Sequence, residues 1–164
     1  MHGSPALHED VRPLEFLIGA WRGEGAGRYP TINPFTYGEE VRFWHIGRPF
    51  LVYSQATWSL DDGSPMHGET GFWRPKPEAR LEVVLAHPSG VVEVEEGSLA
   101  VDRGAIRIEL ATITVGQTTT AKPVDALTRS FRGEGDSLSY SVGMAAVGQT
   151  LQHHLGAELR RVGG

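Results

Sequence analysis

The sequence GAWRGEG, at residues 19–25, has the pattern G-x-W-x-G-x-G. In an extended strand Gly19, Gly23 and Gly25 share one face, because side chains alternate between the two faces. Such glycines usually mark a sharp bend or the close approach of another backbone or a ligand. Trp21 lies on the same face and fills the space that the glycines open. We interpret this stretch as the first strand of a closed β-barrel that encloses a ligand.

Length and composition indicate one folded domain. The chain has 164 residues, of which 40% are hydrophobic and 21% charged, as is ordinary for a globular protein. It has no cysteine, which excludes disulfides, thiolate chemistry, iron–sulfur clusters and cysteine-ligated zinc or haem. The net charge is −5 and the basic residues are scattered, so we expect no nucleic-acid partner.

The N-terminal residues are polar. We predict a flexible tail at residues 1–12, in which His2 and His8 are solvated, followed by a single barrel domain at residues 13–164. The tail lacks the apolar segment of a signal peptide. No apolar run in the chain approaches the roughly 18 residues that span a bilayer. We therefore expect a cytoplasmic protein without a membrane partner.

Short alternations of apolar and polar residues recur along the chain, at residues 41–54, 81–85, 91–95, 99–101, 106–120 and 138–142. Turn-forming clusters separate the alternating runs, at residues 45–49, 61–65, 75–77, 87–90, 102–104 and 133–136. This spacing is typical of an antiparallel meander. About ten strands fit, and a sheet of that size tends to close because closure removes its exposed edges.

We therefore predict an all-β fold. It is an up-and-down antiparallel barrel of about ten strands, lipocalin-like or fatty-acid-binding-like, with a short helix at residues 11–18. A ten-stranded barrel is wide enough to enclose a small molecule.

Histidines are the main candidates for chemistry. His45 and His87 adjoin turns, and we expect His45 to be a surface or turn residue and His87 to be a hydrogen-bonded turn residue. His67 follows Met66 at the start of a strand, where ordinary packing and the lining of an apolar pocket are equally expected.

His153 and His154 are adjacent in the last predicted strand, so only one of them can point into the barrel. Simple alternation groups His153 with the apolar Leu155, and His154 with polar residues. A wide barrel can carry apolar residues on either face, so alternation does not decide between the two histidines.

Known catalytic motifs are missing from the sequence. It has no H-x-H, H-x-x-x-H or H-E-x-x-H spacing, no G-x-S-x-G and no phosphate-binding loop. The carboxylates are scattered, so they do not indicate a glycosidase pair. One inward histidine in an otherwise apolar barrel would naturally be an axial haem ligand.

Further motifs extend along the chain in a fixed order: YPTI at 29–32, PMHxExGFxRP at 65–75, LAHPSGxxExxEG at 85–97, Lys122 with Arg129, Met144-Ala145, and HLxAxLxR at 154–161. Together with the glycine strand they cover nearly the whole chain, residues 14–161. By these motifs the chain resembles the nitrobindins, a family of haem-binding β-barrels once grouped with fatty-acid-binding-like domains.

The resemblance implies a set of site residues. His154, rather than His153, would be the catalytic residue and the ligand of the iron in a b-type haem, one per chain. The other cofactor-binding residues that it implies are Thr31, Ile32, Met66, His67, Lys122 and Met144. Thr31 would lie against the porphyrin and Lys122 would reach a haem propionate. We expect the distal side to be poor in polar groups, with Ile32, Phe43 and Met66 as neighbours of the bound ligand.

The implied activity is that of a ferric haem protein that binds nitric oxide and isomerises peroxynitrite to nitrate, which would scavenge reactive nitrogen species. One alternative is a non-catalytic carrier of a fatty acid or another apolar ligand. Such a carrier needs neither His154 nor Thr31 and would instead place an arginine pair inside the barrel. Another alternative is a haem sensor whose reactivity is incidental. The sequence leaves a homodimer open.

Overall fold

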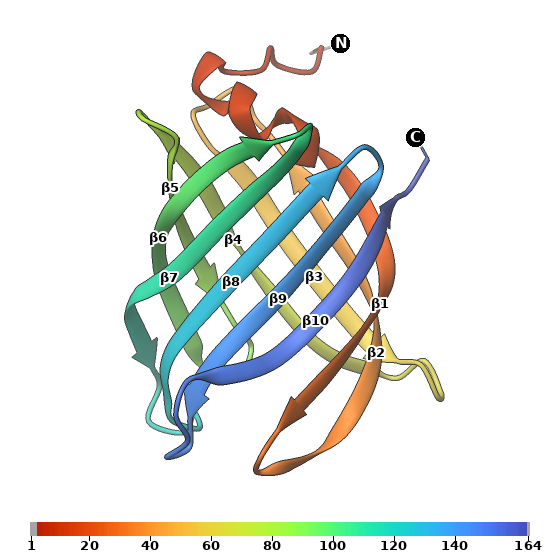
Figure 1. The fold of residues 1–164 in the computed structure, drawn as a ribbon, viewed down its shortest axis with the longest axis vertical. Coiled ribbons are helices and arrows are strands. Elements are labelled where there is room, and N and C mark those ends of the chain that lie inside the picture. Colours follow the sequence, from red (N-terminus) through yellow and green to blue (C-terminus); the bar gives the residue numbers. More distant parts are fainter. Residues whose placement is uncertain (1–2, 164) are drawn as a thin grey trace.

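The computed structural model describes residues 3–163, so His2 lies outside the described part of the chain. Within that part, ten antiparallel strands form one closed barrel with a 3-10 helix at one end (Figure 1). The elements are η1 (Glu9–Leu17), β1 (Gly19–Tyr29), β2 (Ile32–Trp44), β3 (Leu51–Ser59), β4 (Pro65–Lys76), β5 (Arg80–Ala86), β6 (Val91–Asp102), β7 (Ala105–Gln117), β8 (Val124–Glu134), β9 (Ser137–Ala146) and β10 (Gln152–Arg161).

The strand order confirms the predicted up-and-down barrel. Each strand pairs with its neighbours in the sequence, and β1 closes the barrel by pairing with β10. The described residues include no helix with the length and apolarity that crossing a membrane requires.

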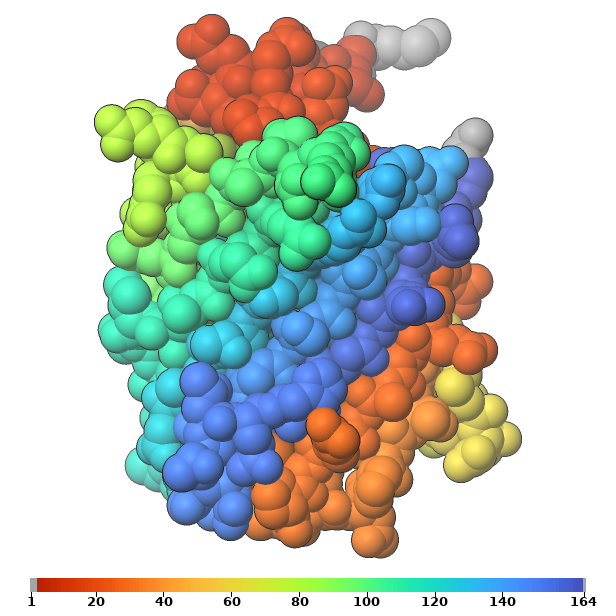
Figure 2. All heavy atoms as spheres, viewed as in Figure 1, coloured from red at the N-terminus to blue at the C-terminus, as the bar shows by residue number. Residues whose placement is uncertain are grey.

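The helix η1 covers one end of the barrel. It begins at Glu9, so residues 9–12, which we had assigned to the tail, belong to it, and Val11 is fully buried. His8 precedes the helix and its imidazole accepts a hydrogen bond from the backbone N–H of Asp10. Figure 2 shows the atoms of η1 seated over this end of the molecule.

Trp21 ties the helix to the barrel. Its indole N–H donates to the carbonyl of Leu17 at 2.9 Å, and the guanidinium of Arg161 lies 4.2 Å from its ring centroid. Arg161 also donates to the carbonyls of Phe16 and Ile18. The tryptophan therefore fixes the joint between η1 and β1, in addition to filling space.

The glycines of β1 allow close approaches on its inner side, as predicted. A Cβ at residue 23 would lie 2.0 Å from the carbonyl oxygen of Glu158 in β10. A Cβ at residue 25 would lie 2.4 Å from the ring of Tyr37, and one at residue 27 would lie 2.2 Å from the ring of Phe35. Glycine is thus required where β10 and the rings of β2 contact β1.

A tightly packed apolar core fills the half of the barrel next to η1. Its largest fully buried side chains are Trp21, Trp73, Phe43, Leu14, Leu17, Leu51, Leu81, Ile108, Leu138 and Leu159. Phe43 packs edge-to-face on Trp73, with ring centroids 5.1 Å apart. The expectation that Phe43 neighbours a bound ligand is therefore wrong, because this residue belongs to the core and does not line the cavity described below.

Candidate functional site

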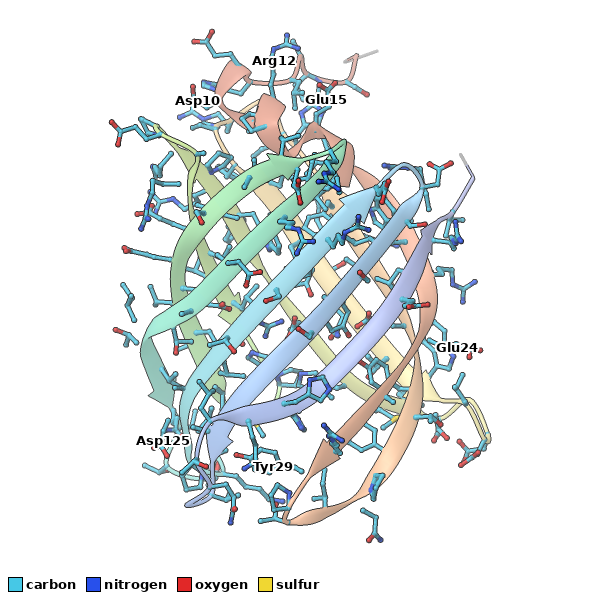
Figure 3. All side chains as sticks on the ribbon, viewed as in Figure 1. Asp10, Arg12, Glu15, Glu24, Tyr29 and Asp125 are labelled. Carbon is cyan, nitrogen blue, oxygen red and sulfur yellow. The ribbon has the colours of Figure 1, made fainter. Side chains whose placement is uncertain are left out.

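The half of the barrel away from η1 contains a cavity of about 330 Å³. Its apolar lining includes Ile32, Phe35, Met66, Leu127, Met144 and Leu155. Ile32 and Met66 are nearly half exposed, at 46% and 45%, and so lie at the open end of the cavity. In Figure 3, Tyr29 and Asp125 lie near this end, whereas Asp10, Arg12 and Glu15 lie at the end covered by η1. The dimensions and lining suit a small apolar ligand with one edge in solvent.

A β-bulge turns His154 into the cavity. His153 is paired with Gly143 and Leu155 with Val142, so His154 is an extra residue in β10. As a result His154 and Leu155 both line the cavity, while His153 is exposed on the outside. Simple alternation, which groups His153 with Leu155, is wrong here because the bulge shifts the phase of the strand.

Hydrogen bonding fixes the protonation of His154. Its Nδ1 lies 3.0 Å from the carbonyl oxygen of Arg28. Because a carbonyl can only accept, Nδ1 carries the proton and Nε2 is left with a free lone pair. Burial lowers the pKa of His154, which favours the neutral form. The ring edge of Tyr29, 5.3 Å away between centroids, and Phe35 hold the imidazole in place.

The other residues implied by the resemblance divide into two groups. Ile32, Met66, His67 and Met144 line the cavity with His154. Thr31 and Lys122 are exposed in the turns between β1 and β2 and between β7 and β8, and are not among the lining residues. Their contacts with a cofactor stay predictions.

A cluster of buried charges lies at the inner end of the cavity, contrary to the expectation of a site poor in polar groups. Arg129 from β8 donates to Glu69 from β4 at 2.8 Å and to Glu93 from β6 at 2.6 Å. Glu95 lies 3.1 Å from the same guanidinium, and Glu39 is also fully buried. The carboxylates that are scattered in the sequence therefore converge in the barrel.

The burial of these carboxyl groups changes their acidity. Burial opposes ionisation of Glu69, but Arg129, through its charge and its hydrogen bonds, and the nearby His87 together outweigh burial and hold the pKa of Glu69 below its usual value. Burial raises the pKa of Glu95 above its usual value, and it raises the pKa of Glu39 to about 7. The sequence did contain a signal for this cluster. In the run Val91-Val92-Glu93-Val94-Glu95, glutamates take the inward positions at which a barrel strand normally places apolar residues.

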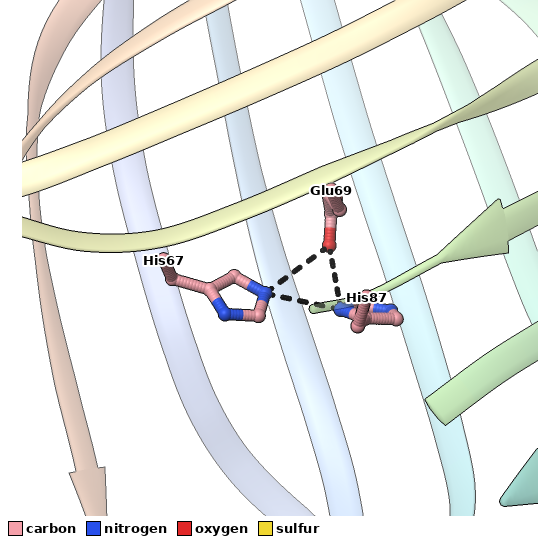
Figure 4. Close-up of side chains that lie close together, drawn as sticks. All are labelled: His67, Glu69 and His87. Carbon is pink, nitrogen blue, oxygen red and sulfur yellow. Dashed lines mark hydrogen bonds and ion pairs between the residues drawn. The ribbon is translucent and has the colours of Figure 1, made fainter. Parts of the chain in front are cut away.

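His67 and His87 connect the cavity to this cluster (Figure 4). His67 Nε2 lies 3.0 Å from His87 Nδ1, and His87 Nε2 contacts the carboxylate of Glu93. His87 is hydrogen-bonded at the start of a turn, as predicted, but its side chain is only 10% exposed and forms part of the cavity wall. Burial lowers the pKa of His67.

The residues present fit a flat, largely apolar cofactor held through one axial nitrogen. His154 presents an unprotonated Nε2 to an apolar cavity, and its other nitrogen is anchored to a backbone carbonyl, as is usual for metal-ligating histidines. Fold and site together define a closed β-barrel with a preformed cavity and an oriented imidazole whose Nε2 is free to bind a metal.

The chain belongs to the family of THAP4-like, haem-binding β-barrel domains, the nitrobindin family, whose model matches residues 10–161. It is 56% identical over 156 residues to peroxynitrite isomerase 2 of Mycobacterium ulcerans, covering 94% of this chain and 96% of the relative. It is 52% identical over 159 residues to peroxynitrite isomerase of Nocardia farcinica, with 96% and 94% covered. The crystal structure of Rv2717c from M. tuberculosis superposes with a TM-score of 0.94 at 50% identity, covering 96% of this chain and all of that one.

Proposed function

We propose that this chain is a ferric haem-b protein that isomerises peroxynitrite to nitrate and binds nitric oxide, with one haem per chain and His154 as the iron ligand. The observation that carries the proposal is the bulge that aims the free Nε2 of His154 into the apolar cavity. The haem-binding family and the peroxynitrite isomerases that resemble this chain support the same reaction.

When bound, the haem supplies a Lewis-acidic, redox-active iron that takes small anions and nitric oxide. The protein's residues hold and orient it. The carbonyl of Arg28 keeps the proton of His154 on Nδ1 and makes Nε2 a better donor to a metal. Ile32, Met66 and Met144 would supply apolar contacts to the bound group. We assign Thr31 to the porphyrin edge and Lys122 to a propionate, since both lie in turns at the open end.

The buried arginine does not favour a carrier of fatty acids. A carrier of this kind needs a cationic side chain that is free to pair with the ligand's carboxylate. Arg129 is the one buried arginine among the described residues, and Glu69, Glu93 and Glu95 surround its guanidinium. Its charge is therefore already neutralised within the protein.

Titration of the haem-free protein with haemin tests the cofactor assignment. The wild-type protein should develop a Soret band at one equivalent, and His154→Ala should lose most of it because the axial nitrogen is gone. His153→Ala is the matched control, since its imidazole is exposed outside the barrel. Equal loss in both variants, or no haemin uptake by the wild type, contradicts the assignment.

Rapid mixing with peroxynitrite tests the reaction itself. The ferric haem-loaded protein should accelerate peroxynitrite decay and yield nitrate, and the haem-free protein should not. A decay rate equal to that of the haem-free protein would eliminate the isomerase and leave a sensor or carrier.

A further inference from the structure

Three side chains that carry potential metal ligands, His67, Glu69 and His87, converge on one point beside the cavity (Figure 4). His67 Nε2 and His87 Nδ1 are 3.0 Å apart. Glu69 Oε2 lies 4.0 Å from the first nitrogen and 3.4 Å from the second. Nitrogen and oxygen donors bound to one tetrahedral zinc-like ion at about 2.0–2.2 Å are themselves about 3.3–3.6 Å apart. The observed spacings scatter around these values, so one ion can reach all three atoms after small side-chain movements.

The lone pairs of the group also point to a cation. His87 Nε2 contacts the carboxylate of Glu93, so in the neutral imidazole the proton lies on Nε2 and Nδ1 is an acceptor. Nδ1 then faces another acceptor, the Glu69 carboxylate, at 3.4 Å. A positive charge between them removes this repulsion. Without an ion, the Nε2–H of His67 can donate to this Nδ1 across 3.0 Å, and a metal ion would take the place of that proton while also balancing Glu69.

Hydrogen bonds with surrounding residues orient His87 and Glu69 in the way that is usual for metal ligands. A histidine that binds metal usually donates its other N–H to a carboxylate, as His87 does to Glu93. Glu69 is held by Arg129 at 2.8 Å and by the hydroxyl of Tyr53 at 2.7 Å. The two carboxylates Glu69 and Glu93 share a single guanidinium, so a bound cation would also offset excess negative charge.

We propose that His67, Glu69 and His87 form a second metal site, for a divalent transition-metal ion such as zinc. Two imidazoles and one carboxylate leave a coordination position open toward the cavity, as in zinc sites that bind water or an anion. The site lies across the cavity from His154, because β4, which carries His67 and Glu69, is four strands from β10 around the barrel, and β5, which ends just before His87, is five strands away. It is separate from the haem ligand and goes beyond the proposed isomerase.

Cobalt titration of haem-free, chelator-treated protein tests the site. At pH 7.5 the wild type should bind one equivalent of Co²⁺ with visible absorption bands, and Zn²⁺ should displace it. His67→Ala should weaken binding at least tenfold and His87→Ala should abolish it. His67 is exposed, so its variant is expected to fold, and thermal melting checks this for both. His153→Ala and His154→Ala should bind Co²⁺ like the wild type.

The melting temperature gives a second measurement. Saturating Zn²⁺ should raise it in the wild type but not in the double variant H67A/H87A, because only a ligand that binds the folded state stabilises it. Absence of cobalt bands in the wild type, or equal binding by the double variant, overturns the proposal and favours a metal-free hydrogen bond between His67 Nε2 and His87 Nδ1. Haemin uptake is measured separately on the same variants, so failure of either site is distinguishable from failure of the other.

Discussion

His153 and His154 are neighbours in the chain, yet only His154 is placed for a chemical role. The extra residue in β10 turns its imidazole inward, and the Arg28 carbonyl selects the tautomer with a free Nε2. An imidazole fixed in this way loses little freedom on binding a metal. At the scale of the single residue, the orientation and the tautomer of His154 are therefore set by one bulge and one backbone hydrogen bond.

Arg129 is the single guanidinium that balances the buried carboxylates, so its removal should be severe. Arg129→Met should lower the free energy of unfolding by about 3–5 kcal/mol, because it leaves buried charges without a partner. Arg132→Met is the matched control on the same strand. Its guanidinium is about half exposed and pairs with Glu134 at the surface, so the loss should stay below about 1 kcal/mol. Urea denaturation measures both, and similar losses would contradict the assigned role of Arg129.

The strand β1 shows how a short element shapes the site. Its inner side carries Trp21 at the end near η1 and glycines further along, where β10 and the ring of Phe35 approach. Phe35 in turn contacts the ring of His154, with centroids 6.5 Å apart. The glycines thus act on the cavity indirectly, through the aromatic ring for which they make room.

Substitution of two strand glycines tests this packing. Gly23→Ala should destabilise the fold by about 1–3 kcal/mol, because the new Cβ meets the backbone carbonyl of Glu158, which cannot move without separating β1 from β10. Gly156→Ala is the control within β10, where a Cβ would lie 3.5 Å from the nearest atoms, an ordinary van der Waals distance. Thermal melts compare the two, and an equal shift in melting temperature would count against the close approach.

The molecule as a whole is divided into an apolar half under η1, a layer of buried charges, and an open half that holds the cavity. The apolar half supplies hydrophobic stabilisation, which compensates for charges that are costly to bury. The polar side chains of the buried charge layer therefore face the cavity from a firmly packed part of the barrel.

Glu39 makes the stability of the whole barrel depend on pH. Burial raises its pKa to about 7, so the folded state keeps a proton that the unfolded state releases near pH 4.5. Its contribution is complete below pH 4.5 and is lost as pH rises to 7. Between pH 5 and 8 the wild type should lose about 2.5 kcal/mol from this group. Glu39→Gln should lack this loss. Urea denaturation of both proteins at pH 5 and pH 8 measures the difference, and the same pH dependence in both would refute the role of Glu39.

Local sequence pattern was sufficient to predict the barrel. Alternation of apolar residues specifies strands, and turn clusters specify where they reverse, so about ten antiparallel strands followed from neighbouring residues alone. The glycine stretch at residues 19–25 predicted close contacts on one face, and these exist at Gly23 and Gly25. The resemblance to the nitrobindins supplied His154, which alternation by itself could not select.

Tertiary structure alone decided the composition of the site. The bulge at His154 depends on the pairing of β10 with β9, and the charge cluster joins Glu69, Glu93 and Arg129 from three strands that do not adjoin one another. Such residues meet only after the barrel has closed, because closure brings inward positions on distant strands to a common axis. The sequence by itself therefore determined the strands of the barrel. The closed structure determined which side chains face each other inside it.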